Sequence, residues 1–365
     1  MTQKDLKIAI VMGTRPEIIK LAPIIRELEQ QDINFEVIFT DQHYDYNLSR
    51  KFFDDLQLEE PKYRLKVGTG TQIEQIGKAL AGIEQIMLKN PSNLIIVQGD
   101  TNSSLSGALV ALKMGIKLAH IEAGLRSYDY RMQEEHNRRI IDHISNYLFA
   151  PTENSVNILK AENVWGKIYN TGNTVIDACL EHLELAKRNS IILDQISFKN
   201  YALATTHRAE NVDDPNTLKN IVQAFLEVPI PIVFPIHPRT LKRLKEFNLF
   251  DDLKDSDKVL LLEPVGYFDF LTLMHQANFI ITDSGGIQEE ATAPNISKFS
   301  FIMRKTSDRP ESVKMGFSKI VGTNKENIIS EIKKYIENPV ILPLVSPYGD
   351  GKASNKIVSI IKDQC

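Results

Sequence analysis

Short apolar runs alternate with longer amphipathic segments along this chain, and that alternation is the feature that most limits how it can fold. In the first half, the runs that we predict to be strands lie at residues 6–12, 35–39, 94–97, 117–121, 147–150 and 168–170. The segments that we predict to be helices lie at residues 16–30, 72–88, 102–114 and 134–146. Strands that alternate with helices form parallel sheets covered on both faces, so the pattern predicts an α/β protein.

The same alternation restarts in the second half of the chain. Predicted strands lie at residues 201–205, 230–235, 259–262, 279–282 and 299–303, and a predicted helix lies at residues 215–227. A charged helical segment at residues 175–190 and an irregular segment at residues 191–199 separate the halves. Because 365 residues exceed one typical core, we predict two doubly wound, Rossmann-like domains that face a cleft.

The predicted domain boundary lies near the start of the charged helical segment. We expect an N-terminal domain over residues 1–172, joined by a C-terminal helix at residues 351–365, and a C-terminal domain over residues 173–350. Ligands of open α/β sheets bind beyond the carboxyl ends of the strands, so we expect the functional residues there.

Composition and missing signatures exclude several classes of protein. The chain has 43 Lys and Arg against 47 Asp and Glu, a balance that argues against a general nucleic-acid or membrane-surface binder. It has no signal peptide and no apolar run of about 18 residues, so we expect a cytoplasmic protein without a membrane span. Cys179 and Cys365 have no metal-ligand spacing, and Gly68-Thr69-Gly70 lacks the third glycine of a dinucleotide fingerprint. We therefore expect neither a metal nor a nucleotide cofactor.

The segment TDSGGIQEE at residues 282–290 follows an apolar run and opens a helix-forming stretch. Gly285 and Gly286 let the backbone approach a bound group closely, and the N–H groups of a helix start suit phosphate. Glu290 lies about one turn further on, where its carboxylate would accept hydrogen bonds from a ribose diol. An ordinary strand-to-helix turn with a glycine-rich cap explains the segment equally well.

Polar clusters follow most of the other predicted strands. In the first half, Arg15 and Lys20 stand beside a glycine turn and a helix start, where basic residues oppose the helix dipole; this favours a diphosphate site over a solvated first turn. Asp100, taken alone, is better explained as a cap of the helix that follows it.

Two further acids belong to the first half. Glu122 precedes Ala-Gly at a strand end and has no obvious capping role. Glu134 and Arg138 share a helix face at a spacing of four, for which an exposed salt bridge is the simplest explanation.

In the second half the polar residues after the strands are mainly cations. They are His207, Arg208, His237, Arg239, Arg304 and Arg309. A lone histidine is more often structural than catalytic, but a His-Arg pair at a strand end improves the odds. Three carboxylates, one histidine and several arginines suit proton transfer coupled to departure of an anionic leaving group such as a diphosphate.

These motifs, taken in order, resemble those of the non-hydrolysing UDP-N-acetylglucosamine 2-epimerases. The resemblance covers nearly the whole chain and rests on GTRPEIIKLAP, QHYDYNLS, GDTNS, HIEAGLRS, EEHNRR, APTE, TGNTVID, THRAEN, HPRT, TDSGGIQEEA and DRPE. It implies a glycosyltransferase-B-like fold, a homodimer, and reversible conversion of UDP-GlcNAc to UDP-ManNAc without NAD or a metal. In that family the C2 proton is removed, UDP leaves C1 to give a 2-acetamidoglucal, and UDP then adds back with a proton on the opposite face.

The resemblance also implies roles for individual residues. The matched acid and base residues are Asp100, Glu122, Glu134 and His207. Matched cations near the sugar diphosphate are Arg15, Lys20, Arg138 and Arg309. The matched UDP-binding positions are the phosphate loop Ser284, Gly285 and Gly286, Glu290 at the ribose, and Phe270 with the backbone of Val265 at uracil. Positions that bind a second, regulatory UDP-GlcNAc in some bacterial members are Gln42, His43, Arg208 and His237.

Departures from the family pattern affect substrate detail and allosteric control rather than the proposed chemical residues. Asp41 replaces a glycine, Gln133 replaces a proline, and the stretch at residues 294–297 is longer than usual. Alternative functions are a hydrolysing 2-epimerase that releases ManNAc and UDP, a 2-epimerase of another UDP-2-acetamido sugar, a retaining glycosyltransferase, and a non-catalytic UDP-sugar sensor.

Overall fold

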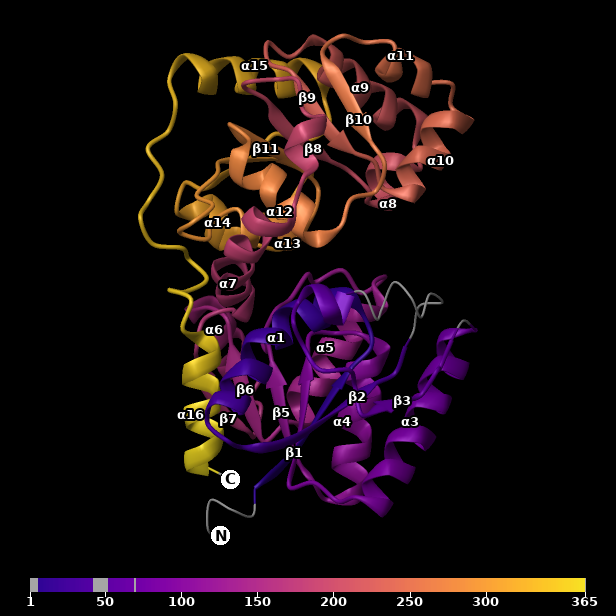
Figure 1. The fold of residues 1–365 in the computed structure, drawn as a ribbon, viewed down its shortest axis with the longest axis vertical. Coiled ribbons are helices and arrows are strands. Elements are labelled where there is room, and N and C mark those ends of the chain that lie inside the picture. The colour runs from indigo at the N-terminus through magenta and orange to yellow at the C-terminus, as the bar shows by residue number, and fades with distance from the viewer. Residues whose placement is uncertain (1–5, 42–51, 69, 365) are drawn as a thin grey trace. The chain divides into compact units, whose positions relative to one another are not determined.

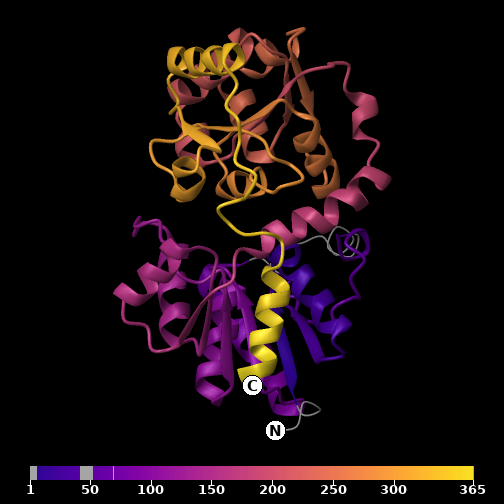
Figure 2. The same ribbon diagram turned by 90° about the vertical axis from the view of Figure 1, so that its left-hand side faces the viewer.

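The computed structural model describes residues 6–41, 52–68 and 70–364, and these form two compact units. Unit 1 consists of Met1–Ala178 with Gly349–Cys365, and unit 2 consists of Cys179–Tyr348. Each unit is a parallel sheet with helices packed on it, as the ribbon views show (Figures 1 and 2). The predicted α/β class and the two Rossmann-like domains are confirmed.

Unit 1 contains a seven-stranded sheet within the described residues, and its paired strands are parallel. In their order across the sheet, the strands are β3 (Tyr63–Arg64), β2 (Asn34–Phe39), β1 (Lys7–Met12), β4 (Leu94–Gln98), β5 (Lys117–Ile121), β6 (Tyr147–Ala150) and β7 (Lys167–Asn170). Its helices are α1 (Arg15–Gln30), α3 (Gln72–Lys89), α4 (Asn102–Met114), α5 (Gln133–Ile144), α6 (Glu153–Ala161) and α16 (Ala353–Gln364). The central strands are fully buried runs such as IAIVM and LIIVQ, as expected for a sheet covered on both faces.

A buried carboxylate fixes the C-terminal helix to unit 1. Asp177, in α7 (Thr174–Asn189), accepts hydrogen bonds from the backbone N–H groups of Ala353 and Ser354 at 3.2 and 2.7 Å and from the Ser354 hydroxyl at 2.6 Å. Since these N–H groups open α16, Asp177 satisfies donors that the helix itself leaves unpaired. α16 then packs against α1.

Unit 2 repeats the design with a six-stranded parallel sheet. In their order across the sheet, the strands are β10 (Val259–Leu262), β9 (Ile232–Pro235), β8 (Ala202–Thr205), β11 (Phe279–Thr282), β12 (Ser300–Ile302) and β13 (Ser318–Ile320). Its helices are α8 (Ala209–Val212), α9 (Pro215–Glu227), α10 (Pro238–Glu246), α11 (Phe250–Lys254), α12 (Tyr267–Gln276), α13 (Gly285–Glu290), α14 (Pro310–Lys314) and α15 (Lys325–Glu337). Phe225, Phe234, Phe279 and Phe301 lie in its core.

Several predicted bounds differ from the structure by one or two residues, and two segments show this most clearly. The helix predicted at residues 134–146 ends at Ile144, because Ser145 has an extended backbone with φ −83° and ψ 141°. The segment at residues 191–199, predicted to be irregular, contains a short 3-10 helix at Ile192–Gln195. In the ranges that the structure describes, no helix has the length and apolar character that crossing a membrane requires.

Candidate active site

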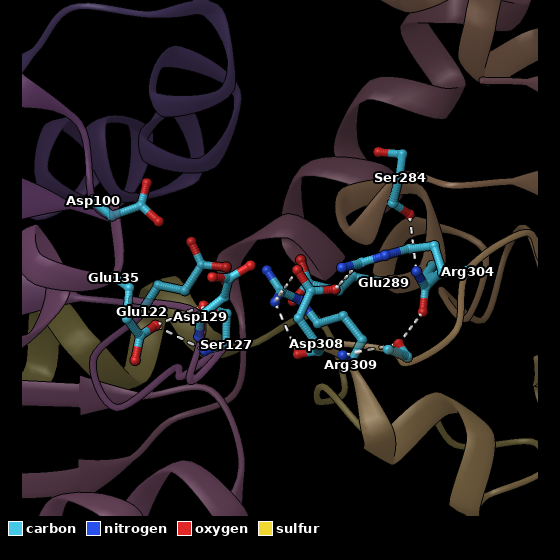
Figure 3. A network of polar contacts seen from close by, with 12 residues as sticks. Asp100, Glu122, Ser127, Asp129, Glu135, Ser284, Glu289, Arg304, Asp308 and Arg309 are labelled. Carbon is cyan, nitrogen blue, oxygen red and sulfur yellow. Dashed lines mark hydrogen bonds and ion pairs between the residues drawn. The ribbon is translucent and has the colours of Figure 1, made fainter. Parts of the chain in front are cut away.

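The polar turns of unit 1 lie together because β1, β4 and β5 are neighbours in a parallel sheet. Their carboxyl ends reach the same edge, which brings the turns at residues 13–14, 99–101 and 122–126 side by side. Figure 3 shows Asp100 and Glu122 on adjacent turns, with Glu135 nearby from α5. Three segments far apart in the sequence thus contribute to one polar surface.

Glu122 is held in place by three donors from different parts of unit 1. Both carboxylate oxygens accept from Lys20 Nζ, at 2.7 and 2.8 Å, while Asn173 Nδ2 donates at 3.1 Å and Gln98 Nε2 also donates. The residue is only 7% exposed and has a left-handed backbone with φ +71°. A non-glycine residue in this conformation is strained, and surroundings that hold it are typical of functional sites.

Asp100 is paired with Arg138 and does not cap the following helix. Arg138 donates to Asp100 Oδ2 from Nε at 2.7 Å, and its Nη2 atom lies 2.6 Å from the same oxygen. The cap of α4 is Thr101, whose side chain accepts from the Ser104 N–H. The prediction that Asp100 is a helix cap is therefore wrong, and its carboxylate is available for another role.

The paired acids at the start of α5 differ in environment. Glu134 is exposed, and the predicted Glu134–Arg138 salt bridge is replaced by a contact from Arg138 to Glu135 at 3.1 Å. Glu135 is fully buried and accepts from the N–H and hydroxyl of Ser127 at 2.8 and 3.0 Å. Burial would raise the pKa of Glu135, but the hydrogen bonds from Ser127 and the charge of Arg138 outweigh it and lower the pKa. Glu135 thus remains ionised and orients Arg138.

A second buried acid, Glu17, ties the first turn to the turn that carries Asp100. Its carboxylate accepts from the backbone N–H groups of Gly13 and Thr14 at 3.0 and 2.7 Å, and from the hydroxyls of Thr101 and Ser104 at 2.7 and 2.9 Å. A Cβ atom on Gly13 would lie 2.0 Å from Ser103 Oγ, so only glycine permits this approach. Burial raises the pKa of Glu17, and these hydrogen bonds oppose that effect.

The predicted cations of the first turn have different surroundings. Lys20 is partly buried beside Glu122, whereas Arg15 is exposed and lies over the ring of Phe52 at 5.8 Å. Arg15 therefore lies at the surface beside an aromatic ring, and Lys20 pairs with an acid. Gln42 and His43, predicted as regulatory positions, lie outside the described residues.

In unit 2 one buried carboxylate organises the turn after β8. Asp283, at the end of the neighbouring strand β11, is fully buried. It accepts from the N–H groups of His207 and Arg208 at 3.0 Å each, from the Thr206 hydroxyl at 2.6 Å and from Asn211 Nδ2 at 3.0 Å. His207 Nδ1 lies 3.6 Å from its other oxygen. The end of β11 and the His-Arg turn after β8 are thereby joined through a single side chain.

His207 and His237 lie close together at this edge, with ring centroids 5.3 Å apart. Burial lowers the pKa of His207; Asp283 opposes this effect, and Arg208 and Arg239 reinforce it. The pKa of His237 is lowered by burial, by the neighbouring His207 imidazole and by the charge of Arg239, while Asp283 opposes this effect. Both imidazoles therefore favour the neutral form at neutral pH.

The arginines of unit 2 surround a cluster of acids. Asp308 contacts Arg304 at 2.8 Å and Arg208 at 3.4 Å, and its pKa is held well below the usual range because Arg309, Arg304 and Arg208 outweigh the effect of burial. Arg309 is 8% exposed and pairs with the fully buried Glu289 (Figure 3). Arg309 is thus anchored from beneath by an acid, as Arg138 is in unit 1.

The predicted UDP-binding positions lie on neighbouring elements of unit 2. Ser284 occupies the N-cap position of α13 without a capping hydrogen bond from its side chain, and a Cβ atom on Gly285 would lie 3.1 Å from an oxygen of Asp308. Glu290 ends α13 and is partly buried. Phe270 on α12 and Val265 just before that helix are also partly buried. Within the described residues, no group of three or more His, Cys, Asp or Glu side chains is arranged to hold a metal ion.

Comparison with known proteins identifies the family of this architecture. The sequence profile described as UDP-N-acetylglucosamine 2-epimerase matches residues 26–362. The chain belongs to this family. The UDP-N-acetylglucosamine 2-epimerase of Methanocaldococcus jannaschii is 47% identical to it over 98% of this chain and 99% of the relative. Family membership predicted from the motifs is thus confirmed.

Solved members of the UDP-N-acetylglucosamine 2-epimerase family share the fold over the whole chain. The M. jannaschii enzyme in complex with UDP-GlcNAc and UDP has a TM-score of 0.87 and 46% identity, covering 98% of this chain and 100% of that one. The Neisseria meningitidis enzyme bound to UDP-GlcNAc has a TM-score of 0.88 and 34% identity, with the same coverage. Another relative, the UDP-2,3-diacetamido-2,3-dideoxy-D-glucuronate 2-epimerase of Pseudomonas aeruginosa, is 36% identical over 98% of this chain and 99% of its own.

Sequence reasoning missed most of the supporting acids of this epimerase-family site. They are Glu17, Glu135, Asp142, Asp283 and Glu289, each of them fully or almost fully buried. A usable signal was present for four of them, because Glu17, Glu135, Asp283 and Glu289 stand inside the motifs quoted above. Asp142 lies three residues beyond EEHNRR and has no such signal. The roles predicted for the site residues themselves remain predictions.

Proposed function

We propose that this protein catalyses the reversible 2-epimerisation of UDP-GlcNAc to UDP-ManNAc without net hydrolysis. A base in unit 1 takes the C2 proton while the C1–O bond breaks, so that UDP departs with the bonding electrons and a 2-acetamidoglucal forms. A proton then returns to the opposite face of C2, and a phosphate oxygen of UDP re-forms the bond to C1. Proton and UDP both leave and return, so the reaction balances without a redox partner.

The observation that carries this proposal is the pair of acids Asp100 and Glu122, each bound to its own cation on neighbouring turns. An ionised carboxylate can accept a proton, which is the role of a general base in this reaction. Glu134 stays a third candidate from the start of α5. Asp100, whose side chain is 26% exposed, is more accessible than Glu122 at 5%.

We propose that the C-terminal domain, residues 173–350, binds UDP and that residues 1–172 with the helix at 351–365 supply the acid and base. Ser284, Gly285 and Gly286 would donate N–H groups to the diphosphate, with Arg309 and Arg15 as counter-charges. Glu290 would accept from the ribose, and Phe270 and Val265 would hold uracil. The neutral imidazole of His207 would accept or donate a proton near the leaving group.

The complexes of the solved relatives with UDP-GlcNAc and with UDP support this assignment of substrate. The decisive experiment is incubation with UDP-GlcNAc in deuterated water, followed by proton NMR. We expect UDP-ManNAc to appear with deuterium at C2 in both epimers and without free sugar. Accumulation of free ManNAc with UDP would instead identify a hydrolysing enzyme, and absence of turnover would favour a UDP-sugar sensor.

The P. aeruginosa relative favours one alternative substrate, a UDP-2,3-diacetamido-2,3-dideoxy-D-glucuronate. The same NMR assay with both nucleotide sugars decides between them through the ratio of kcat/KM values. We also expect a homodimer, which light scattering of the purified protein tests. A sigmoidal dependence of rate on UDP-GlcNAc would support the regulatory role proposed for Arg208 and His237.

A further inference from the structure

His120 is a fully buried histidine of β5 whose ring contacts an acceptor at each nitrogen. Its Nε2 lies 2.9 Å from the backbone carbonyl oxygen of Gly99. Its Nδ1 lies 2.7 Å from Asp142 Oδ1. A carbonyl oxygen only accepts hydrogen bonds, so the Nε2 atom must carry a proton.

Asp142 is the ionised partner in the second contact. Its other oxygen takes Arg126 at 2.7 Å and the N–H of Gly124 at 3.2 Å, so donors already surround it. An ionised carboxylate only accepts, and the Nδ1 atom must therefore carry a proton as well.

We infer that His120 is a charged imidazolium that acts as a positioning residue, holding the turns of Asp100 and Glu122 to each other. The inference rests on the proposed function for the roles of those two acids. A neutral imidazole has a single N–H and would leave a lone pair facing either the carbonyl or the carboxylate. That contact would be repulsive in a site shielded from water, where unpaired polar groups are costly.

Charge balance inside the cluster supports the same protonation state. Asp142 comes from α5, Arg126 from the turn after β5 and Glu162 from the end of α6, and Arg126 pairs with both acids. Arg139 of α5 borders the cluster through Glu162 at 3.0 Å. Arg139 thus offsets Glu162, whose side chain is 18% exposed, and Arg126 divides its charge between Glu162 and Asp142. A protonated His120 therefore supplies charge beside the fully buried Asp142, where a carboxylate most needs compensation.

The ring connects the two turns through specific backbone groups. Gly99 precedes Asp100, and its N–H donates to the carbonyl of Ile121 at 3.1 Å while its own carbonyl accepts from His120. Both faces of this turn are therefore fixed to β5. Asp142 holds Gly124, two residues after Glu122. The imidazolium and its partner thus set the separation of the two acids without touching substrate.

A direct test is nitrogen-15 NMR of the histidines in the full-length protein. We expect both ring nitrogens of His120 to stay in the protonated range from pH 6 to 9. His120→Gln assigns the signal by its loss, and His143→Gln, at an exposed position of α5, is the matched control that retains it. A single-proton tautomer of His120 at pH 8 would overturn the inference. This measurement does not depend on which reaction the protein catalyses.

A kinetic test separates positioning from a merely structural role. Because misplacement of about 1 Å can cost about 100-fold, we expect His120→Gln to lower kcat about 100-fold with little change in KM or in calorimetric UDP affinity. Asp142→Asn removes the carboxylate that keeps His120 protonated. We therefore expect His120 to lose a proton at high pH in this variant, so that its kcat falls there while wild-type kcat does not. Wild-type kcat in a folded His120→Gln protein would overturn the positioning role.

The outcomes remain separable if a variant fails to fold. The Asp142→Asn protein then decides, because its His120 must titrate between pH 6 and 9 if Asp142 maintains the charge; an unchanged doubly protonated signal contradicts the inference. If the wild-type protein does not epimerise UDP-GlcNAc, the proposed function fails, whereas the NMR result on His120 stands on its own.

Discussion

The two units share one fold and hold their turns in the same way, yet the residues at the carboxyl edge of each sheet differ in chemistry. In unit 1 the candidate catalytic groups are acids, Asp100 and Glu122, and each is bound by a cation that is itself partly buried. In unit 2 the outer groups are cations, and acids such as Asp283 lie beneath them. Buried carboxylates fix the turns in both units. The fold therefore supplies positions, and residues at the strand ends decide the chemistry.

Removing an acid of unit 1 should have the largest effect on activity. Asp100→Asn and Glu122→Gln each keep shape and lose the proton acceptor, so we expect kcat to fall about 1,000-fold. UDP affinity, measured by calorimetry, should remain that of the wild type because UDP is assigned to unit 2. Glu84→Gln, at an exposed position of α3, is the control for loss of an acid in the same unit. Turnover within a few-fold of wild type in either variant would remove that residue from the acid and base set.

Removing the buried acid of unit 2 should instead affect stability and UDP binding together. Asp283→Asn replaces an oxygen that accepts four hydrogen bonds with an amide group that donates. We expect a loss of about 3 kcal/mol in the free energy of unfolding, measured with denaturant, and weaker UDP binding. Asp251→Asn, at an exposed position of α11, provides the control. An unchanged unfolding midpoint would contradict the supporting role of Asp283.

Sequence patterns predicted some of the elements that make these contacts and missed others. Periodicity predicted the strands around β1, β4 and β5 because buried parallel strands are continuous apolar runs. Short or highly charged helices such as α6 and α10 were not predicted, since their stability comes from packing and caps rather than from a long apolar stripe. The quoted motifs identified the turns of the candidate site because these motifs stand at the ends of strands.

Sequence could not predict which member of an acidic pair faces inward. Glu134 and Glu135 are adjacent, and only the packing of α5 decides that Glu135 meets Arg138 and Ser127. The same limit applies to Asp100, whose pairing with Arg138 depends on a neighbour 38 positions away. Local capping rules favoured the nearer partner and gave the wrong answer there.

A finer test of the comparison is Glu290→Ala in the part of unit 2 that we propose binds UDP. A ribose diol that donates to a carboxylate contributes about 1.5 kcal/mol, so we expect about a tenfold loss of UDP affinity. At saturating substrate, kcat should change little, in contrast to the acid variants of unit 1. Calorimetric titration with UDP measures the loss, and Glu184→Gln, on the exposed surface of α7, is its control. Equal UDP affinity in Glu290→Ala and wild type would refute contact with the ribose.

The smallest expected effect concerns the pH dependence of unit 2. Burial lowers the pKa of His207 in the folded protein below its ordinary value of about 6.5. Between these two values the unfolded chain binds more protons, so stability falls as the pH is lowered through about 6.5 toward the folded pKa. Between pH 7 and 5, the wild type should lose less than about 1 kcal/mol more free energy of unfolding than His207→Gln, measured by denaturant unfolding. His143→Gln serves as the control for loss of an imidazole from unit 1. A slope that is as steep in His207→Gln as in the wild type would mean that His207 gains its proton as easily in the folded protein as in the unfolded chain, and the neutral form assigned to His207 would then have no electrostatic basis.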